Sequence, residues 1–432
     1  MGLKIAVIGA ASSYTPELFA NLMELREHLD VEQVTLMDPN LEKVTFIAEV
    51  SRRLLVGSGM KLQIITTQER QGAITGADFI ILQIRIGGLA GRIRDEKLPM
   101  EFDLVGNETT GAGGFISALR TVPVALEIAQ DIERISPKAW LMNLSNPAGI
   151  VTEALLKHSN VRTLGFCNIP INTQYALSAI LQVPPASIQL ESFGLNHVSW
   201  VRAVMVDGQE RLQPLIAAAR SRRSVLYRNG LVEDLIEPDW LRTLGMLPGW
   251  YLRYFYYPRQ VLKQDKDSLR SEGEADLLAE EKLRLIYSTE GFGLEARRIL
   301  EAKGGAQYYL PVLQAMVSIV HDRGEVVIAD VRNGSALPDL PPEVCVEVPA
   351  RIGRDSIEPL GMGPMPLCVR GLVQTLKAYE ELTIQAAITG DHGAAVAALV
   401  THPLVGSYPK ARAFFDRALQ NETAYLHQFL KG

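Results

Sequence analysis

The first 166 residues alternate short apolar runs with amphipathic stretches, and this alternation constrains the fold more than any other feature. The apolar runs occupy residues 5–8, 34–37, 62–65, 79–83, 139–143 and 163–166. Runs of this length, separated by segments long enough for a helix, are typical of a parallel sheet covered by helices on both faces. We therefore predict a doubly wound α/β domain over residues 1–166.

The alternation of apolar runs and amphipathic stretches changes in the second part of the chain, residues 167–432. Short strand-like runs at 199–206, 326–331 and 344–348 lie among long helical segments such as 372–389 and 392–401. This mixture predicts a second, mixed α/β lobe. Internal repeats and low-complexity linkers are absent from the sequence, which favours two lobes that share one interface over two independent domains.

Composition excludes several classes of protein. The 432 residues are 47% hydrophobic and 21% charged, with a net charge of -6 and scattered Lys and Arg, so we expect neither nucleic acid nor a membrane as a partner. No run approaches the roughly 18 apolar residues of a membrane span, and the first strand leaves no room for a signal peptide. Three cysteines match no zinc motif. We expect a reduced, cytoplasmic protein.

The turn after the first strand and the end of the second strand form a candidate dinucleotide site. A helix N-terminus after strand one can hold a pyrophosphate, and an acidic residue ending strand two can accept hydrogen bonds from a ribose. The predicted cofactor-binding residues are Gly9, Ser12, Ser13 and Asp38. Only Gly9 matches the G-x-G-x-x-G pattern of a Rossmann-like domain. A plain strand-to-helix turn with Ser12 or Ser13 as its N-cap remains the alternative.

Cys167 and His197 form a candidate metal pair. Each follows a strand-like run, residues 161–164 and 188–193, so both can reach one cleft at the strand ends. Two protein ligands leave most coordination positions free for substrate oxygens and water, which suits a catalytic metal. The alternatives are a small buried cysteine and an ordinary hydrogen-bonded histidine.

An ordered series of motifs relates the whole chain to one family. The series comprises residues 83–89, the Arg-x-x-Asp-Glu motif that begins at Arg92, and residues 106–114, 143–150, 165–170 and 196–197. Together these motifs resemble the family-4 glycoside hydrolases, an NAD-dependent exception to hydrolysis by paired carboxylates. Cys-Asn-x-Pro at 167–170 is similar to the pattern of 6-phospho-β-glucosidases. Their α-specific relatives carry an aspartic acid where this chain has Asn168.

The resemblance implies a specific reaction and its cofactors. NAD+ removes a hydride from C3 of the sugar, a base removes the C2 proton, and the glycosidic oxygen leaves by elimination before water adds and the hydride returns. A divalent metal, which we expect to be Mn2+, is held by Cys167 and His197 against the sugar O2 and O3. Tyr251 is the implied base. From the residues alone, Tyr254 and Tyr256 remain alternatives.

The resemblance also implies the substrate and the residues that hold it. The substrate is a phosphorylated disaccharide or β-glucoside, and the protein is a homo-oligomer, either a dimer or a tetramer. Arg92 binds the phosphate, because a guanidinium donates a bidentate pair, while Asn146 and Asn168 bind the sugar. The alternatives are an ion pair of Arg92 with Asp95 or Glu96, and an ordinary turn at Asn146.

Three departures from the family pattern bear on binding. Ala10 and Ala11 replace part of a glycine-rich run, and Lys303 replaces an arginine, which leaves open whether these positions weaken the binding of cofactor or substrate. Two other functions therefore stay open. One is an NAD-dependent 2-hydroxy-acid dehydrogenase on the lactate/malate dehydrogenase fold, which the predicted Rossmann-like domain also resembles. The other is a catalytically silent nucleotide-binding sensor, against which the intact metal and base positions argue.

Overall fold

The computed structural model describes residues 2–305 and 307–430. Its large sheet contains six parallel strands in the order 3-2-1-4-5-6, the order of a Rossmann fold. The strands are β1 (Leu3–Ile8), β2 (Val31–Met37), β3 (Gln63–Thr67), β4 (Phe79–Leu82), β5 (Trp140–Asn143) and β6 (Arg162–Gly165). All six predicted apolar runs are strands, and the predicted doubly wound sheet is confirmed.

Three strands from the second part of the chain extend this sheet beyond β6. They are β11 (Glu325–Arg332), β12 (Cys345–Ile352) and β13 (Ile357–Pro359), all antiparallel to their neighbours. We expected the runs at 326–331 and 344–348 to belong to a separate lobe. Instead they cover the open edge of β6, whose backbone groups need partners. The division of the chain at residues 166 and 167 stays a prediction.

Helices cover both faces of the large sheet. In the first part of the chain they are α1 (Thr15–Glu24), α2 (Leu41–Leu55), α3 (Arg70–Ile74), α4 (Gly88–Met100), α5 (Gly111–Ile135) and α6 (Ala148–His158). α5 is long and apolar enough to cross a membrane, but 72% of its most apolar window is buried inside the protein. It is therefore a core helix.

The start of α5 explains a glycine-rich stretch of the sequence. A Cβ at Gly113 would lie 2.2 Å from the carbonyl oxygen of Asn107, and one at Gly114 would lie 2.3 Å from the backbone of Thr109. Only glycine permits this approach. The first turn of α5 therefore packs directly against the loop that carries Glu108 and Thr109.

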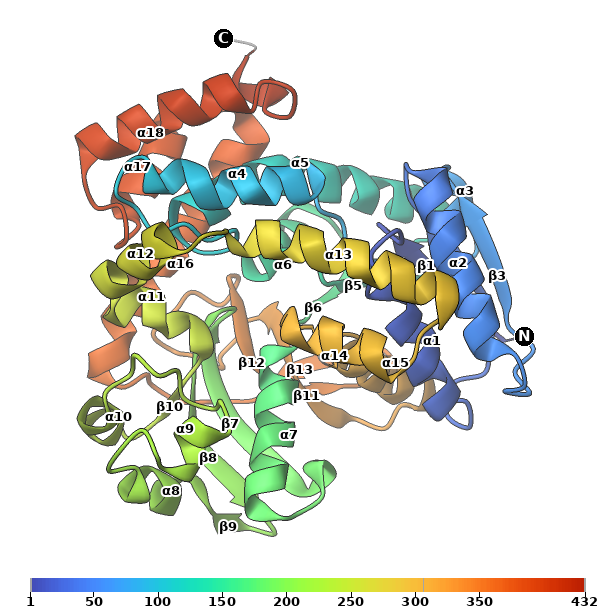
Figure 1. Ribbon diagram of the computed structural model, residues 1–432, viewed down its shortest axis with the longest axis horizontal. Helices are drawn as coiled ribbons and strands as arrows, with labels where there is room; N and C mark the ends of the chain where they lie inside the picture. The colour runs from blue at the N-terminus through green and yellow to red at the C-terminus, as the bar shows by residue number, and fades with distance from the viewer. Residues whose placement is uncertain (1, 306, 431–432) are drawn as a thin grey trace.

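A smaller antiparallel sheet forms the lobe at the lower left of Figure 1. It contains β7 (Ile188–Leu195), β8 (Val198–Val206), β9 (Gln209–Glu210) and β10 (Leu247–Pro248). Its helices are α8 (Leu212–Ala218), α9 (Val225–Arg228) and α10 (Pro238–Leu244), and sheet and helices share a separate apolar cluster. This lobe presents the β7–β8 turn toward the large sheet.

The remaining helices link and cover the two sheets. They are α7 (Ile169–Leu181), α11 (Arg253–Tyr256), α12 (Pro258–Asp267), α13 (Glu272–Thr289), α14 (Leu294–Ala302), α15 (Leu310–His321), α16 (Leu367–Thr389), α17 (His392–Thr401) and α18 (Tyr408–Asn421). α13 runs alongside α4, and α16 packs against α5 and α17 (Figure 1). Segments distant in sequence therefore surround the edge where the parallel strands end, the usual ligand site of such sheets.

Candidate active site

Cys167 and His197 meet where the two sheets approach one another. Cys167 follows β6, and His197 is the second residue of the two-residue turn between β7 and β8. The Cys167 Sγ and the His197 Nε2 lie 3.5 Å apart. The predicted pair is therefore in contact, although its members come from different sheets.

The chemistry of this pair fits a bound divalent metal. Burial lowers the pKa of His197 to about 3, so its imidazole is neutral and can act as a ligand. Burial and the charges of Glu347 and Asp330 raise the pKa of the Cys167 thiol, and a bound cation would reverse that shift. A sulfur and a nitrogen donor 3.5 Å apart can bind the same divalent ion.

The rest of the coordination sphere is left open. Within the described part of the chain, no group of three or more His, Cys, Asp or Glu side chains is placed to hold a metal. A structural metal site normally has four protein ligands. The geometry therefore fits a metal that completes its coordination with substrate and water.

Tyr251 lies against the metal pair. It belongs to the short 3-10 helix Trp250–Leu252, and its ring stacks on His197 with centroids 3.8 Å apart and planes inclined by 4°. Burial, followed by the charges of Cys167 and Glu272, raises the pKa of the Tyr251 phenol, whereas a hydrogen bond with Thr109 lowers it. A cation beside Cys167 would further favour the phenolate.

The two alternative tyrosines are occupied elsewhere. The Asn107 amide donates a hydrogen bond to the Tyr254 hydroxyl at 2.9 Å, and Tyr254 is buried. The Trp200 indole donates to the Tyr256 hydroxyl at 3.1 Å. Of the three tyrosines, Tyr251 is the one that stacks on His197.

The predicted nucleotide turn has a tight, glycine-dependent geometry. Gly9 has a φ of +88°, and a Cβ there would lie 2.6 Å from the carbonyl oxygen of Gln83. The Asp38 carboxylate accepts a hydrogen bond from the Ala11 amide at 3.2 Å. Asp38 thus lies beside the turn, as the binding of an adenosine ribose requires. The N-cap of α1 is Tyr14, so the alternative with a serine cap is wrong.

The two serines of this turn have different surroundings. Ser12 accepts a hydrogen bond from the Tyr14 amide at 3.3 Å. The Ser13 hydroxyl donates to Glu280 at 2.6 Å, and the Lys303 ammonium lies 3.3 Å from the same hydroxyl and 2.8 Å from Glu280. Ser13 therefore points toward α13, and its contact with a cofactor stays a prediction.

Arg92 is nearly buried among four carboxylates. Its guanidinium nitrogens lie 2.7 Å from Glu96, 2.6 Å from Asp276, 3.1 Å from Glu272 and 3.3 Å from Glu108. The predicted alternative of an ion pair with Glu96 is therefore present, as part of a larger network. Sequence reasoning missed the partners on α13, which lie about 180 residues away and carry no local signal.

A second arginine lies beside this network. Arg85 follows β4 and forms an ion pair with Glu108, and 38% of its side chain is exposed, compared with 11% for Arg92. Asp95, the other predicted partner of Arg92, instead pairs with the buried Arg120 at 2.5 Å. Sequence reasoning assigned no role to Arg85, although its position three residues after a central strand was a usable signal.

The two asparagines predicted to bind sugar follow the neighbouring strands β5 and β6. Asn146 is half-buried between β5 and α6, at a cis peptide bond with Pro147. Asn168 directly follows Cys167, and its amide donates to the carbonyl of Gly304 at 2.6 Å. Both positions border the same strand ends, and their contacts with sugar stay predictions.

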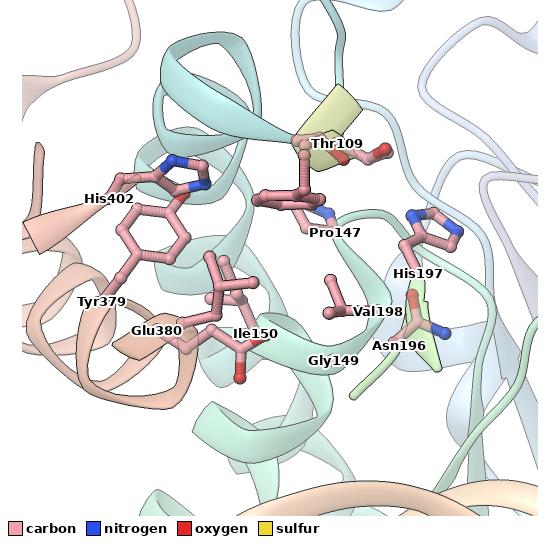
Figure 2. A pocket seen from close by; sticks show the side chains of 13 residues that line it. Thr109, Pro147, Gly149, Ile150, Asn196, His197, Val198, Tyr379, Glu380 and His402 are labelled. Atoms are coloured by element: carbon pink, nitrogen blue, oxygen red, sulfur yellow. The ribbon is translucent and has the colours of Figure 1, made fainter. Parts of the chain in front are cut away.

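A cavity of about 30 Å³ lies beside His197, which forms part of its lining. Figure 2 shows His197 and Asn196 on one side of it and Tyr379, Glu380 and His402 on the other. Burial lowers the pKa of His402 to about 3, so this histidine is neutral.

Comparisons with known proteins place the whole chain in one family. The family model described as family 4 glycosyl hydrolase matches residues 4–183, and the model of the C-terminal domain of that family matches residues 192–405. A Bacillus subtilis (strain 168) protein named probable 6-phospho-beta-glucosidase is 34% identical, over 99% of this chain and 98% of its own length. The 6-phospho-beta-glucosidase of Escherichia coli (strain K12) is 30% identical, over 94% of this chain and 92% of its own length.

Solved structures show the same relationship. The Thermotoga maritima 6-phospho-beta glucosidase with NAD and glucose-6-phosphate has a TM-score of 0.90 at 26% identity, covering 98% of this chain and 99% of its own. The Plasmodium falciparum malate dehydrogenase, at 15% identity and a TM-score of 0.51, shares the fold alone, which confirms the predicted dehydrogenase-like architecture. The family match, rather than this shared fold, argues against the hydroxy-acid dehydrogenase alternative. The chain belongs to family 4 of the glycosyl hydrolases.

Proposed function

We propose that this protein hydrolyses 6-phospho-β-glucosides with the help of NAD+ and a divalent metal. One observation carries the proposal: Tyr251 stacks on His197, which in turn contacts Cys167, so a base and two metal ligands share one site. The Escherichia coli and Thermotoga maritima relatives are named 6-phospho-beta-glucosidases, and a further Thermotoga maritima structure contains manganese, NAD+ and glucose-6-phosphate. The same three side chains argue against a silent nucleotide sensor.

The bound groups supply chemistry that the side chains lack. NAD+ provides reversible oxidation at C3 of the sugar, and the metal provides a Lewis acid next to O2 and O3. Gly9, Ser12, Ser13 and Asp38 are the residues we propose for NAD+. Cys167 and His197 would hold the metal.

Tyr251 would move the proton at C2. Its hydroxyl oxygen accepts that proton during elimination and returns a proton when water adds, as a general base and then a general acid. The phenol must lose its own proton first, and burial opposes this loss. The hydrogen bond with Thr109 favours the phenolate, and so does any positive charge next to Cys167.

Binding of the 6-phosphate would use Arg92, with Arg85 beside it. Arg92 already has carboxylate partners, so phosphate must replace some of them or bind at its remaining donors. Asn146 and Asn168 would hold sugar hydroxyls. Asn168 has no acidic proton, which agrees with a β-linked rather than an α-linked substrate in the pattern of this family.

Three further properties belong to the proposal. The catalytic part spans residues 167–432 and the nucleotide-binding part residues 1–166, although β11–β13 join the first sheet. The protein acts in the cytoplasm, where phosphorylated sugars are available. It is a homo-oligomer, a dimer or a tetramer.

Activity on matched chromogenic substrates tests the proposal directly. We expect hydrolysis of a 6-phospho-β-glucoside that requires both NAD+ and Mn2+, little hydrolysis of the 6-phospho-α-glucoside, and very little of the unphosphorylated β-glucoside. NADH should not accumulate, because the hydride returns to the sugar in each turnover. Hydrolysis that persists after removal of NAD+ and metal would contradict the proposal.

A further inference from the structure

Glu347, a buried residue of β12, holds both ends of the turn that carries His197. Its carboxylate accepts a hydrogen bond from the Asn196 amide at 3.0 Å and another from the Ser199 hydroxyl at 2.8 Å. Asn196 and Ser199 lie on either side of His197 in sequence. Glu347 itself is only 2% exposed. One side chain of the large sheet thus fixes a turn that belongs to the small sheet.

The turn needs such support because its backbone conformation is unfavourable. His197 has a φ of +65°, in the left-handed region that side chains other than glycine rarely adopt. Gly194, just before the turn, has a φ of +138°, and a Cβ there would lie 2.3 Å from the carbonyl oxygen of Val198. A left-handed conformation at a residue other than glycine costs free energy, and contacts from outside the turn can offset that cost.

The same part of the large sheet reaches the other metal ligand. Glu347 pairs across the ladder with Asp330 of β11, and Asp330 pairs with Gly165 of β6. Gly165 lies two residues before Cys167, and a Cβ on it would lie 2.8 Å from the Cβ of Asp330. Gly165, Asp330 and Glu347 therefore form one row of paired residues across β6, β11 and β12. This row connects the end of β6, just before Cys167, with the turn that carries His197.

We propose that Glu347 is a positioning residue of the metal centre, which sets the distance between the His197 Nε2 and the Cys167 Sγ by holding Asn196 and Ser199. This inference rests on the proposed function, because it assumes that the pair binds a metal. Glu347 acts through hydrogen bonds rather than coordination, since no group of three metal-ligating side chains occurs among the described residues. Partners of this kind typically change metal affinity by about 10- to 100-fold.

The test compares metal affinity in variants that keep or remove the hydrogen bonds. Free Mn2+ is measured by electron paramagnetic resonance during titration of the full-length protein with saturating NAD+ and glucose 6-phosphate. Glu347→Met leaves Asn196 and Ser199 without a partner and should weaken Mn2+ binding by about tenfold or more. Glu347→Gln should stay within about threefold of wild type, because an amide can accept from Asn196 and donate to Ser199.

Two more variants keep the test decisive. Ser199→Ala removes one of the two hydrogen bonds at little cost in volume, so it should give a smaller loss even if Glu347→Met fails to fold. Cys167→Ser reports on the metal site itself. NAD+ affinity, followed by fluorescence, should be unchanged in every folded variant, which separates positioning from general destabilisation.

The outcomes distinguish failure of the proposed metal site from failure of the positioning role of Glu347. If Cys167→Ser binds Mn2+ as tightly as wild type, the proposed metal site is wrong and the inference fails with it. If Cys167→Ser loses Mn2+ while Ser199→Ala and any folded Glu347→Met retain full affinity, the metal site stands and the positioning role is overturned. Equal losses in Glu347→Gln and Glu347→Met would also overturn it, because charge rather than hydrogen bonding would then matter.

Discussion

The imidazole of His197 and the phenol of Tyr251 lie face to face, with ring centroids 3.8 Å apart and ring planes inclined by 4°. This contact joins the 3-10 helix Trp250–Leu252 to the β7–β8 turn. It places the proposed base against a proposed metal ligand. Proton transfer by Tyr251 and metal binding by His197 are therefore expected to depend on one another.

Replacement of Tyr251 by phenylalanine separates its chemistry from its packing. The variant keeps the ring that stacks on His197 but loses the oxygen that accepts the C2 proton. Turnover should fall by about 100-fold or more, and deuterium from D2O should no longer appear at C2 of the product, as measured by NMR. NAD+ binding should be retained.

Tyr254→Phe is the matched control for this prediction. Tyr254 is buried and its hydroxyl accepts from Asn107, so its loss should lower stability while C2 exchange continues. Undiminished turnover in Tyr251→Phe would assign proton abstraction to another residue. Product without C2 deuterium in the wild type, despite turnover that needs NAD+, would contradict solvent-exchangeable abstraction.

Loss of either proposed metal ligand should stop the reaction without loss of nucleotide binding. Cys167→Ser and His197→Ala each leave one strong ligand, so turnover should be abolished while NAD+ affinity, measured by calorimetry, is nearly unchanged. The nucleotide turn at Gly9 belongs to another strand end, which is the physical reason for this independence. Activity in either variant that equals wild type and resists a chelator would rule out the metal site.

The Arg92→Lys variant tests whether Arg92 binds the 6-phosphate of the substrate. Lysine keeps the charge but loses the planar fork, so KM for the phosphorylated substrate should rise, while the low rate on the unphosphorylated glucoside barely changes. Arg94→Lys is the control, because Arg94 lies on the same helix but pairs with Glu422 at 2.5 Å. Equal losses on both substrates would assign Arg92 a structural role among its carboxylates.

Buried His402 should make the protein sensitive to acid. Its pKa is lowered by burial from 6.5 to about 3, so between these values the unfolded chain binds more protons than the folded one. The free energy of unfolding therefore falls as pH falls through this window. Denaturant titrations of the metal-free protein at several pH values measure the slope of the free energy of unfolding against pH.

His402→Asn should reduce that slope by up to about 1.4 kcal/mol per pH unit. Asparagine can still accept the hydrogen bond that the Leu404 amide donates to the histidine Nδ1 at 3.1 Å. Because Glu380 and the other buried acids titrate in both proteins, the difference between the two curves isolates the histidine. Parallel curves for wild type and variant would show that His402 is charged in the folded protein.

The sequence by itself determined the parallel sheet, and it singled out Cys167 and His197 as the proposed ligand pair. The observed strands begin and end within three residues of the predicted runs, because burial on both faces leaves a continuous apolar run that ends at a polar turn. Each of Cys167 and His197 follows a strand, so their approach to one another could be predicted, and the structure places them 3.5 Å apart; their role as metal ligands stays a proposal. Tyr251 could be proposed as the base only through the family resemblance, since a segment rich in tyrosine has no local feature that distinguishes one tyrosine from the next.

Only the tertiary structure decided which distant segments complete the site. β11–β13 join the edge of β6, α13 brings Glu272 and Asp276 to Arg92, and β12 brings Glu347 to the turn of His197. These partners lie about 150 to 180 residues from the residues they contact. Their positions depend on strand register and on packing between layers, and a strand or helix has the same local pattern whichever neighbour it finally contacts.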